Sequence, residues 1–463
     1  MPGLFQGLEI GKRALLSYQL SLQTIGHNIA NVDTPGYSRQ RVSLTETLPE
    51  VTAIGSIGTG VTAQDIRQVR DLFLGQQYRE AQKALGQWSY KNKTLTQIES
   101  LVNEPQDNAL GAQLNSFWDA WTQLSTNADS PSNKANVVAE ASKLVNGFHQ
   151  LSQQLSDLRA SIDSDIGNVT DQVNSLTGQI ASLNQQIASS ELGGTPANDL
   201  RDQRDKLIDD LSTLVDVRTV QKPNGSNLVY MGGMVIVDGS DSFPIGVNVV
   251  NQKGVQTHEV VWKGTAVQLT NLNGQLYGLL QSRDQLIPDY LDKLNTLAKS
   301  LVDQVNTIHQ SGHAVDGSDG VPFFDPRYTD AATIRVNDAL INDSSLVVAS
   351  QGTDSDNLVA LQMAGLRDAK VLNNSTVTLN EYYSSLVGKL GIESQESDSF
   401  AKNYELLVQQ VDNSRQSVQG VSLDEEMTNM IQAQHAYDAA ARVITTMDQA
   451  LDTVINGMGI VGR

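Results

Sequence analysis

Two interleaved series of apolar residues, each with a spacing of seven, run through the N-terminal part of the chain and constrain its fold more than any other feature. In a helix, positions seven apart lie on nearly the same face, so two such series offset by three form one narrow apolar seam. A seam of this width buries its side chains best against the seam of another helix. The two series consist of Leu8, Leu15, Leu22 and Ile29, and of Leu4, Gly11, Tyr18, Ile25 and Val32.

A matching seam lies at the other end of the chain. From Leu423 onward, apolar residues again recur every seven positions, with a second series offset by three. Ser422 and Glu425 have the spacing of a capping box, which predicts that this helix begins at Leu423. We therefore predict that the N- and C-terminal helices pair as a coiled coil. The terminal seam, predicted to be the assembly surface, consists of Leu8, Leu15, Leu22, Ile25, Ile29, Met430, Tyr437, Ile444, Leu451 and Met458.

The N-terminal helix is predicted to end in a turn that contains Pro35 and Gly36. Thr34 precedes the proline, and a residue in that position is pushed out of the helical region of backbone space. The Pro-Gly pair then forces a turn. The candidate functional residues of this signature turn are Asn31, Thr34, Pro35, Gly36, Tyr37 and Arg39.

Charge and composition exclude several classes of function. With 32 Lys and Arg against 52 Asp and Glu, the formal net charge is −20, which repels nucleic-acid backbones and anionic lipids, so neither partner is expected. The absence of cysteine excludes disulfides, thiolate metal sites and cysteine nucleophiles. No apolar run is long enough to span a membrane, and no cleavable signal peptide is expected from the N-terminus.

Helical periodicity dominates most of the remaining chain. A seam from Leu144 to Ile187 predicts one helix that follows Pro131 and spans roughly 70–80 Å. So long an element suits a rod-shaped subunit better than a compact enzyme. Three tryptophans fall on apolar helix stripes, so core positions are favoured over a carbohydrate platform; they are Trp88, Trp118 and Trp121.

Between Val215 and Leu272 the apolar pattern changes from helical to alternating. Asn224-Gly225 and Asp238-Gly239 are typical of hairpin turns between strands. The predicted fold class is therefore mainly α with a small inserted β domain (α+β). We expect a terminal coiled-coil domain from residues 1–60 and 400–463, a helical-bundle domain with short strands from residues 61–214 and 275–399, and an inserted β domain from residues 215–274.

Motifs that carry chemistry are incomplete in this chain. His258-Glu259 begins like the zinc-peptidase motif HExxH, but the second histidine is absent and the flanking residues favour a strand. Glycines between Gly55 and Gly60 lack the spacing of a phosphate-binding loop. Residues 198–205 alternate in charge, which we interpret as a solvated helix face rather than a metal site. No catalytic, cofactor-binding or metal-binding residue is predicted, and no cofactor is expected.

The signature turn carries a resemblance to a known family. Residues 30–37, with the sequence Ala-Asn-Val-Asp-Thr-Pro-Gly-Tyr, resemble the signature shared by the rod, hook and hook-associated proteins of the bacterial flagellum. The extension Tyr37-Ser38-Arg39-Gln40 is similar to the hook-associated members, as are residues 420–426 read together with residues 437–443. The resemblance covers both ends and patches of the middle of the chain.

This resemblance implies a non-enzymatic structural adaptor that assembles at the distal end of the hook and forms the hook–filament junction. It implies four partners: the hook protein, the second hook–filament junction protein, copies of the chain packed laterally in a tube, and a cytosolic export chaperone at the C-terminal helix. Composition alone would suggest an intracellular protein, whereas the resemblance implies export by the flagellar type III apparatus, without a cleaved signal peptide, to the extracellular flagellum. Stacking of copies would bury the terminal seam, at about 25 cal/mol per Å² of apolar surface.

Two alternative functions are open. Another flagellar axial subunit, of the filament or hook type, would share the paired ends; a hook subunit is expected to be rich in β structure between them, whereas this chain is mostly long helices. A secreted enzyme with a catalytic β insertion would need clustered acids with perturbed pKa values, or a nucleophile beside a base, and the sequence offers neither.

Overall fold

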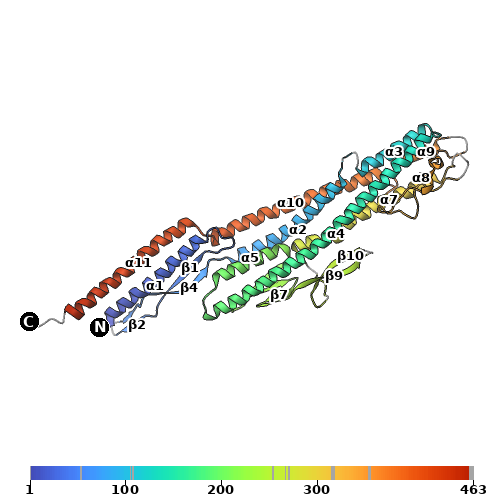
Figure 1. Ribbon diagram of the computed structural model, residues 1–463. Helices are drawn as coiled ribbons and strands as arrows, with labels where there is room; N and C mark the ends of the chain where they lie inside the picture. Colours follow the sequence, from blue (N-terminus) through green and yellow to red (C-terminus); the bar gives the residue numbers. More distant parts are fainter. Residues whose placement is uncertain are drawn as a thin grey trace, which may run out of the picture.

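The molecule is a long rod in which the first and last helices lie side by side at one end (Figure 1). Next to this terminal helix pair comes a helical bundle that carries β structure along one side, and a lobe of short elements closes the far end (Figure 1). The predicted fold class, mainly α with an inserted β domain, is confirmed. The computed structural model describes residues 2–52, 55–104, 106, 109–252, 255–265, 267–269, 272–313, 319–352 and 356–457.

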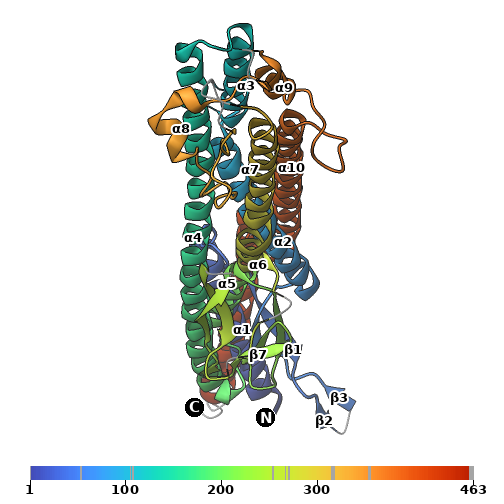
Figure 2. The same ribbon diagram turned by 90° about the vertical axis from the view of Figure 1, so that its right-hand side faces the viewer.

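The terminal helix pair is antiparallel. Helix α1 (Pro2–Ala30) runs toward the bundle, and α11 (Leu423–Asp452), followed by the π-helical turn η4 (Thr453–Gly457), runs back beside it. A ribbon of two antiparallel strands packs on α1, and a small hairpin extends beyond the ribbon (Figure 2). These strands are β1 (Gln40–Glu46) with β4 (Val61–Gln68), and β2 (Glu50–Thr52) with β3 (Gly55–Ile57).

The bundle is built on one very long helix, α4 (Pro131–Ser190), which begins with Ser130 as its N-cap. Its 60 residues correspond to about 90 Å, more than the predicted 70–80 Å, because the helix continues well before Leu144. The other bundle elements are α2 (Leu72–Val102), α3 (Leu110–Thr126), η1 (Glu191–Gly193), α5 (Asn198–Leu214), α6 (Gly274–Gln281), the π-helical η2 (Ser282–Leu286), α7 (Ile287–His309) and α10 (Leu379–Gln419).

The β insertion lies against α4. It forms a four-stranded antiparallel sheet in the order β5-β6-β7-β8 and a separate hairpin, β9-β10. The two predicted turns are confirmed, because Asn224-Gly225 connects β5 to β6 and Asp238-Gly239 connects β7 to β8. The strands are β5 (Val217–Gln221), β6 (Asn227–Met231), β7 (Met234–Asp238), β8 (Asp241–Ser242), β9 (Ile245–Gln252) and β10 (Val255–Trp262).

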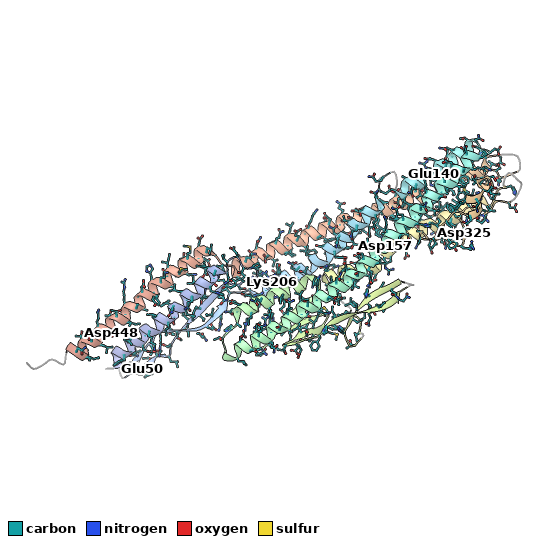
Figure 3. All side chains as sticks on the ribbon, in the orientation of Figure 1. Glu50, Glu140, Asp157, Lys206, Asp325 and Asp448 are labelled. Atoms are coloured by element: carbon teal, nitrogen blue, oxygen red, sulfur yellow. The ribbon has the colours of Figure 1, made fainter. Side chains whose placement is uncertain are left out.

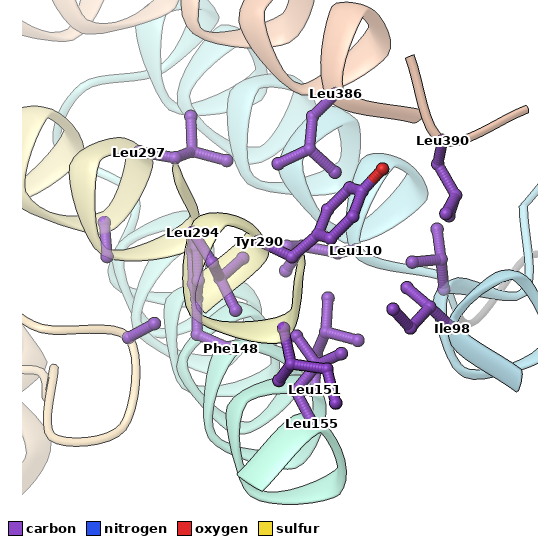
Figure 4. Packing of buried hydrophobic residues seen from close by; sticks show 14 of the residues in the cluster. Ile98, Leu110, Phe148, Leu151, Leu155, Tyr290, Leu294, Leu297, Leu386 and Leu390 are labelled. Carbon is purple, nitrogen blue, oxygen red and sulfur yellow. The ribbon is translucent and has the colours of Figure 1, made fainter. Parts of the chain in front are cut away.

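The core runs through the bundle and the distal lobe. In Figure 4, side chains from α2, α3, α4, α7 and α10 converge, with Tyr290, Phe148 and Leu386 among them. Trp118 and Trp121 are fully buried, as the helix stripes predict, whereas Trp88 is half-buried and stacks on Phe400. The short elements of the distal lobe are α8 (Asp338–Asn342), η3 (Ser344–Leu346) and α9 (Leu358–Gly365).

Candidate assembly site

Small residues allow the two terminal helices to approach closely. A Cβ atom added at Gly11 would lie 2.8 Å from Cγ1 of Ile444, and one added at Gly7 would lie 2.8 Å from Cε of Met447. Ala440, which is buried, also faces α1 at this level, since its carbonyl oxygen is 3.6 Å from the same added atom at Gly11. The helices are therefore held together along a line of small residues, and no side chain larger than glycine fits at these positions without displacing its neighbour.

The terminal seam is only partly covered by this contact. Ile25 is buried, whereas the other described members are half-buried, and Met458 lies outside the described residues. Apolar side chains on α11 are more exposed still, with Met427 57% and Ile431 53% exposed. The half-buried members are Leu8, Leu15, Leu22, Ile29, Met430, Tyr437, Ile444 and Leu451.

A single buried amide, that of Asn28, connects the pair to the signature turn. Its Nδ2 donates to the carbonyl oxygen of Gln40 at 2.9 Å and to Oε2 of Glu426 at 3.0 Å. Its Oδ1 accepts from the hydroxyl of Tyr37 at 2.8 Å and from the backbone N–H of Gln40 at 2.9 Å. All four hydrogen-bonding positions of the amide are thus used, which fixes the register of α1 against α11. Asn28 was not predicted from the sequence, because it lies beside the apolar positions of the seam rather than among them.

The signature turn is closed by local hydrogen bonds. Asn31 donates to the carbonyl oxygen of His27 at 3.0 Å, and the hydroxyl of Thr34 donates to Oδ1 of Asn31 at 3.2 Å. Gly36 has a φ of +85°, and a Cβ at this position would lie 3.3 Å from the side chain of Lys206. Only glycine combines this backbone conformation with so close an approach.

The end of the turn is docked on the bundle. The backbone N–H of Arg39 donates to the carbonyl oxygen of Gln419 at 2.8 Å, and the Arg39 guanidinium pairs with Glu425. The hydroxyl of Tyr37 lies near Asp199, Asp202 and Glu426, and its pKa is raised by burial and by these charges. The turn is therefore the place where α1, α10 and α11 meet.

Several charged residues of α5 form a buried network, so the prediction of a solvated helix face for residues 198–205 was wrong. Asp202, Arg204 and Asp205 are all less than a tenth exposed. The backbone N–H of Ser38 donates to Asp202 at 2.8 Å, and Arg70 pairs with Asp205. The sequence could not reveal these partners, because they come from segments far away in the chain.

Asp209 connects three helices in the same network. Its carboxylate accepts from Nε of Arg79 on α2 at 2.7 Å and from Nη1 of Arg415 on α10 at 2.6 Å. The Arg415 guanidinium also lies 4.0 Å from the ring centre of Tyr78, a cation–π contact. We call the region formed by the signature turn, α5 and the end of α10 the polar joint; Lys206 marks its place in Figure 3.

One carboxyl group of the polar joint has a strongly shifted pKa. Burial raises the pKa of Asp202 to about 6, against the opposing effect of the Ser38 hydrogen bonds and of Arg70, whose Nη1 lies 3.9 Å from Asp202 Oδ1. The proton is therefore bound more tightly in the folded chain, so this group stabilises the fold below about pH 4 and the effect is lost as the pH rises through 6. A cleft of about 580 Å³ opens beside it, lined by the turn, α5 and the end of α10.

The motifs that suggested chemistry have structural roles. His258 lies on β10, and its Nδ1 is 2.5 Å from Oδ2 of Asp163, whose other oxygen accepts from Arg283 at 2.6 Å. This ion-paired group ties the β insertion to α4 and η2. Among the described residues there is no group of three or more His, Cys, Asp or Glu that could hold a metal ion. In the same part of the chain, no helix has the length and apolarity to cross a membrane.

Rod shape, paired chain ends and a partly covered apolar seam define the class of the molecule: a structural subunit of a larger assembly. A family model described as "Flagellar hook-associated protein FlgK helical domain" matches residues 95–324. A second, "Flagellar basal body rod FlgEFG protein C-terminal", matches residues 414–457.

Relatives match over the whole length. The flagellar hook-associated protein 1 of Bacillus subtilis is 35% identical over 508 aligned positions that cover 100% of both chains. That of Salmonella typhimurium is 24% identical, covering 95% of this chain and 97% of the relative. The chain belongs to the flagellar hook-associated protein 1 family. It is thus a structural protein of the extracellular bacterial flagellum, which confirms the resemblance seen in the signature turn.

The fold is shared with a solved structure. The structure described as that of the flagellar hook junction protein FlgK from Burkholderia pseudomallei superposes with a TM-score of 0.66 at 17% identity. It covers 74% of this chain and 100% of that chain.

Proposed function

We propose that the chain is the structural adaptor that assembles at the distal end of the flagellar hook and forms the hook–filament junction. The observation that carries this proposal is the paired, partly covered terminal helices in a chain that matches hook-associated protein 1 along its entire length. In a tube of many copies, neighbouring subunits would cover the half-buried terminal seam. Burial at about 25 cal/mol per Å² of apolar surface would supply the driving force.

The proposed partners are those of a junction. They are the hook protein on one side, the second hook–filament junction protein on the other, and further copies of this chain laterally. A cytosolic export chaperone would cover the exposed apolar residues of α11, among them Leu423, Met427 and Ile431, before export by the flagellar type III apparatus without a cleaved signal peptide. An export chaperone is expected to bind such a surface because it would otherwise aggregate.

We propose no enzymatic activity. Asp202, whose pKa is raised, is part of the polar joint. There it accepts a hydrogen bond from the backbone N–H of Ser38, which holds α5 to the signature turn. The His258 and Asp163 pair is joined to Arg283 rather than to a nucleophile. Both arrangements support a structural interpretation of the polar clusters.

We also propose a revised division into domains. Helix α10 runs unbroken from Leu379 to Gln419, so the boundary predicted at residue 400 lies inside a helix. Gly420, with an extended backbone, follows α10 directly. Strand β4 (Val61–Gln68) pairs with β1, so the terminal domain also extends beyond residue 60. We therefore place the boundaries of the terminal domain near residue 70 and at Gly420.

The proposed function is tested in a flagellated bacterium whose own copy of this gene is deleted. We expect deletion cells to build hooks, release filament subunits into the medium and fail to swim, and we expect the restored gene to place the protein on isolated hooks. Immunogold labelling of purified hooks measures its position. Filaments that form normally without the gene, or label along the whole filament, would contradict a junction role.

A further inference from the structure

A groove on the terminal helix pair contains a buried negative charge. It lies between α1, β1 and α11 and has a volume of about 430 Å³. Ile25, Leu44 and Ala433 contribute apolar walls, and Glu426 also lines it. Leu44 is 41% exposed, so one wall of the groove is open to an apolar side chain from outside.

Glu426 is 2% exposed and lacks a cationic partner among the described residues. Its side chain has one hydrogen bond, in which Oε2 accepts from the neutral amide of Asn28 at 3.0 Å. A buried carboxylate that no cation neutralises is costly to the fold. A cationic side chain entering the groove would remove that cost.

The same helix offers such a side chain. Arg442 is exposed on α11 and makes no ion pair within the described part of the chain. By contrast, Lys12 and Arg13 pair with Glu9, and Arg39 pairs with Glu425. Arg41 lines the groove but also forms no ion pair with Glu426 at salt-bridge distance.

We propose that Arg442 of one copy enters this groove on the next copy and pairs with Glu426, while Val443, 42% exposed, packs on Leu44. Glu426 and Arg442 of one chain are sixteen positions apart on a continuous helix, about 24 Å, so a chain cannot place its own Arg442 in its own groove. Each copy then offers its groove to one neighbour and its Arg442 to another.

This contact is of the head-to-tail type, in which each interface joins two different surfaces. A contact of this kind repeats around a ring or along a helix of subunits. This inference rests on the proposed function, in which all copies in the tube point the same way. Copies arranged in that way are related by a rotation and a shift, so they cannot form a two-fold contact between these surfaces. The occupant of the groove is therefore a second copy of this chain, and the recognised chemistry is a guanidinium with an adjoining β-branched side chain.

Charge reversal tests the pairing. With the wild-type protein first shown on isolated hooks, Arg442→Glu is expected to lower the amount recovered on hooks at least tenfold. The exposed Arg218, on β5, provides the matched control, and Arg218→Glu should leave recovery unchanged. Circular dichroism of the secreted proteins checks that both variants are folded. Wild-type recovery of folded Arg442→Glu would overturn the inference, whereas absence of the wild-type protein from hooks would instead overturn the proposed function.

Cross-linking tests the location. The chain has no cysteine, so a variant with Gln432→Cys on the groove and Val443→Cys contains the only two thiols. They lie about 16 Å apart on one helix, too far for a disulfide within a chain. Oxidised junctions on hooks should give a ladder of linked copies from this variant and none from either single variant. Absence of linkage, or dimers alone, would overturn the head-to-tail contact.

Discussion

The bundle and the terminal helix pair bury their apolar residues in different ways. In the distal part of the bundle, Phe117, Trp118 and Trp121 have no exposed surface, and aromatic rings from α3 and from residues 323–324 pack on one another. In the pair, contact is made through glycine and alanine, and side chains such as Leu16 and Ile431 are more than half exposed. The distal core of the bundle is therefore complete within one chain, whereas the pair has surface left for neighbours.

This difference separates stability from assembly. A substitution in the distal core of the bundle should lower the stability of the isolated subunit, because that core is buried within one chain. A substitution in the pair should affect the assembled junction more than the isolated subunit. The two regions are joined at the polar joint by polar contacts, among them the Ser38–Asp202 hydrogen bond and the Arg70–Asp205 ion pair.

The largest expected effect comes from a charge in the terminal seam. Ile444→Asp places a carboxylate where α11 packs against Gly11 of α1, at a general cost of several kcal/mol. Junctions should not form, and cells should build hooks, shed filament subunits and fail to swim. The main thermal transition of the isolated subunit, which reports the bundle, should remain near that of the wild type.

Asp438→Asn, on an exposed position of α11, is the control and should swim normally. Soft-agar motility and calorimetry give the two readouts. Normal swimming of Ile444→Asp would show that the terminal seam is not the assembly surface. Loss of the main transition would show that the bundle depends on the pair.

A truncation in the bundle core should have the opposite signature. Phe117→Ala removes a fully buried ring that touches Trp118, Trp121 and Phe323, and should cost about 3–5 kcal/mol of unfolding free energy. Phe400→Ala, at a position 37% exposed, should cost clearly less. Urea unfolding followed by tryptophan fluorescence measures both, and equal losses would contradict a core centred on Phe117.

Acid should weaken the bundle through one histidine. His309 is fully buried, with Nδ1 2.6 Å from the carbonyl oxygen of Val321 and Nε2 accepting from the backbone N–H of Val348 at 3.0 Å. Burial lowers the pKa of His309 from 6.5 to about 4, with Lys134 acting in the same direction. The unfolded chain therefore binds the proton more readily, so stability is lost as the pH falls from about 6.5 toward 4.

Between pH 7 and pH 5 the loss expected from His309 alone is about 2 kcal/mol, and the raised pKa of Asp202 acts in the opposite direction over the same range. Calorimetry at a series of pH values measures it. His309→Gln should flatten this pH dependence, whatever its effect on stability at pH 7. A variant that keeps the full acid response would assign the effect to other groups.

The smallest effect concerns two glycines of α1. A methyl group at Gly11 would lie 2.8 Å from Ile444 Cγ1, whereas one at Gly26 would meet nothing within 4 Å. Gly11→Ala should therefore loosen the pair by about 1–2 kcal/mol, and Gly26→Ala should stabilise α1 by about 0.5–1 kcal/mol. Hydrogen exchange of α1 amides should be faster in the first variant and slower in the second. The same change in both would mean that the helices do not approach at Gly11.

Periodicity predicted the helices because it reflects local geometry. Most residues of the seam from Leu144 to Ile187 are buried in α4, as predicted. The hairpin turns of the β insertion lie at the predicted Asn-Gly and Asp-Gly pairs. Pairing of the two chain ends was also predictable, since each helix carried an apolar seam without a neighbour in sequence. The assembly role of the terminal seam remains a prediction.

The polar joint could not be predicted in the same way. Charged residues at helical spacing indicate a solvated face unless their partners are known, and the partners of α5 are distant in sequence. Asp209 and Arg415 are 206 residues apart, and Arg70 and Asp205 are 135 residues apart. Nothing local to residues 198–209 distinguishes a buried ion-pair network from a surface one.

The hydrogen bond between Asn28 and Glu426 joins residues 398 positions apart. Contacts of such sequence separation form late, because bringing the two ends together costs the entropy of closing a very long loop. During synthesis or export of the chain, α1 therefore emerges long before α11, the helix that packs against it. Closure of the ends is thus available only to a full-length molecule, and a prematurely terminated chain would lack the partner that covers the small-residue face of α1.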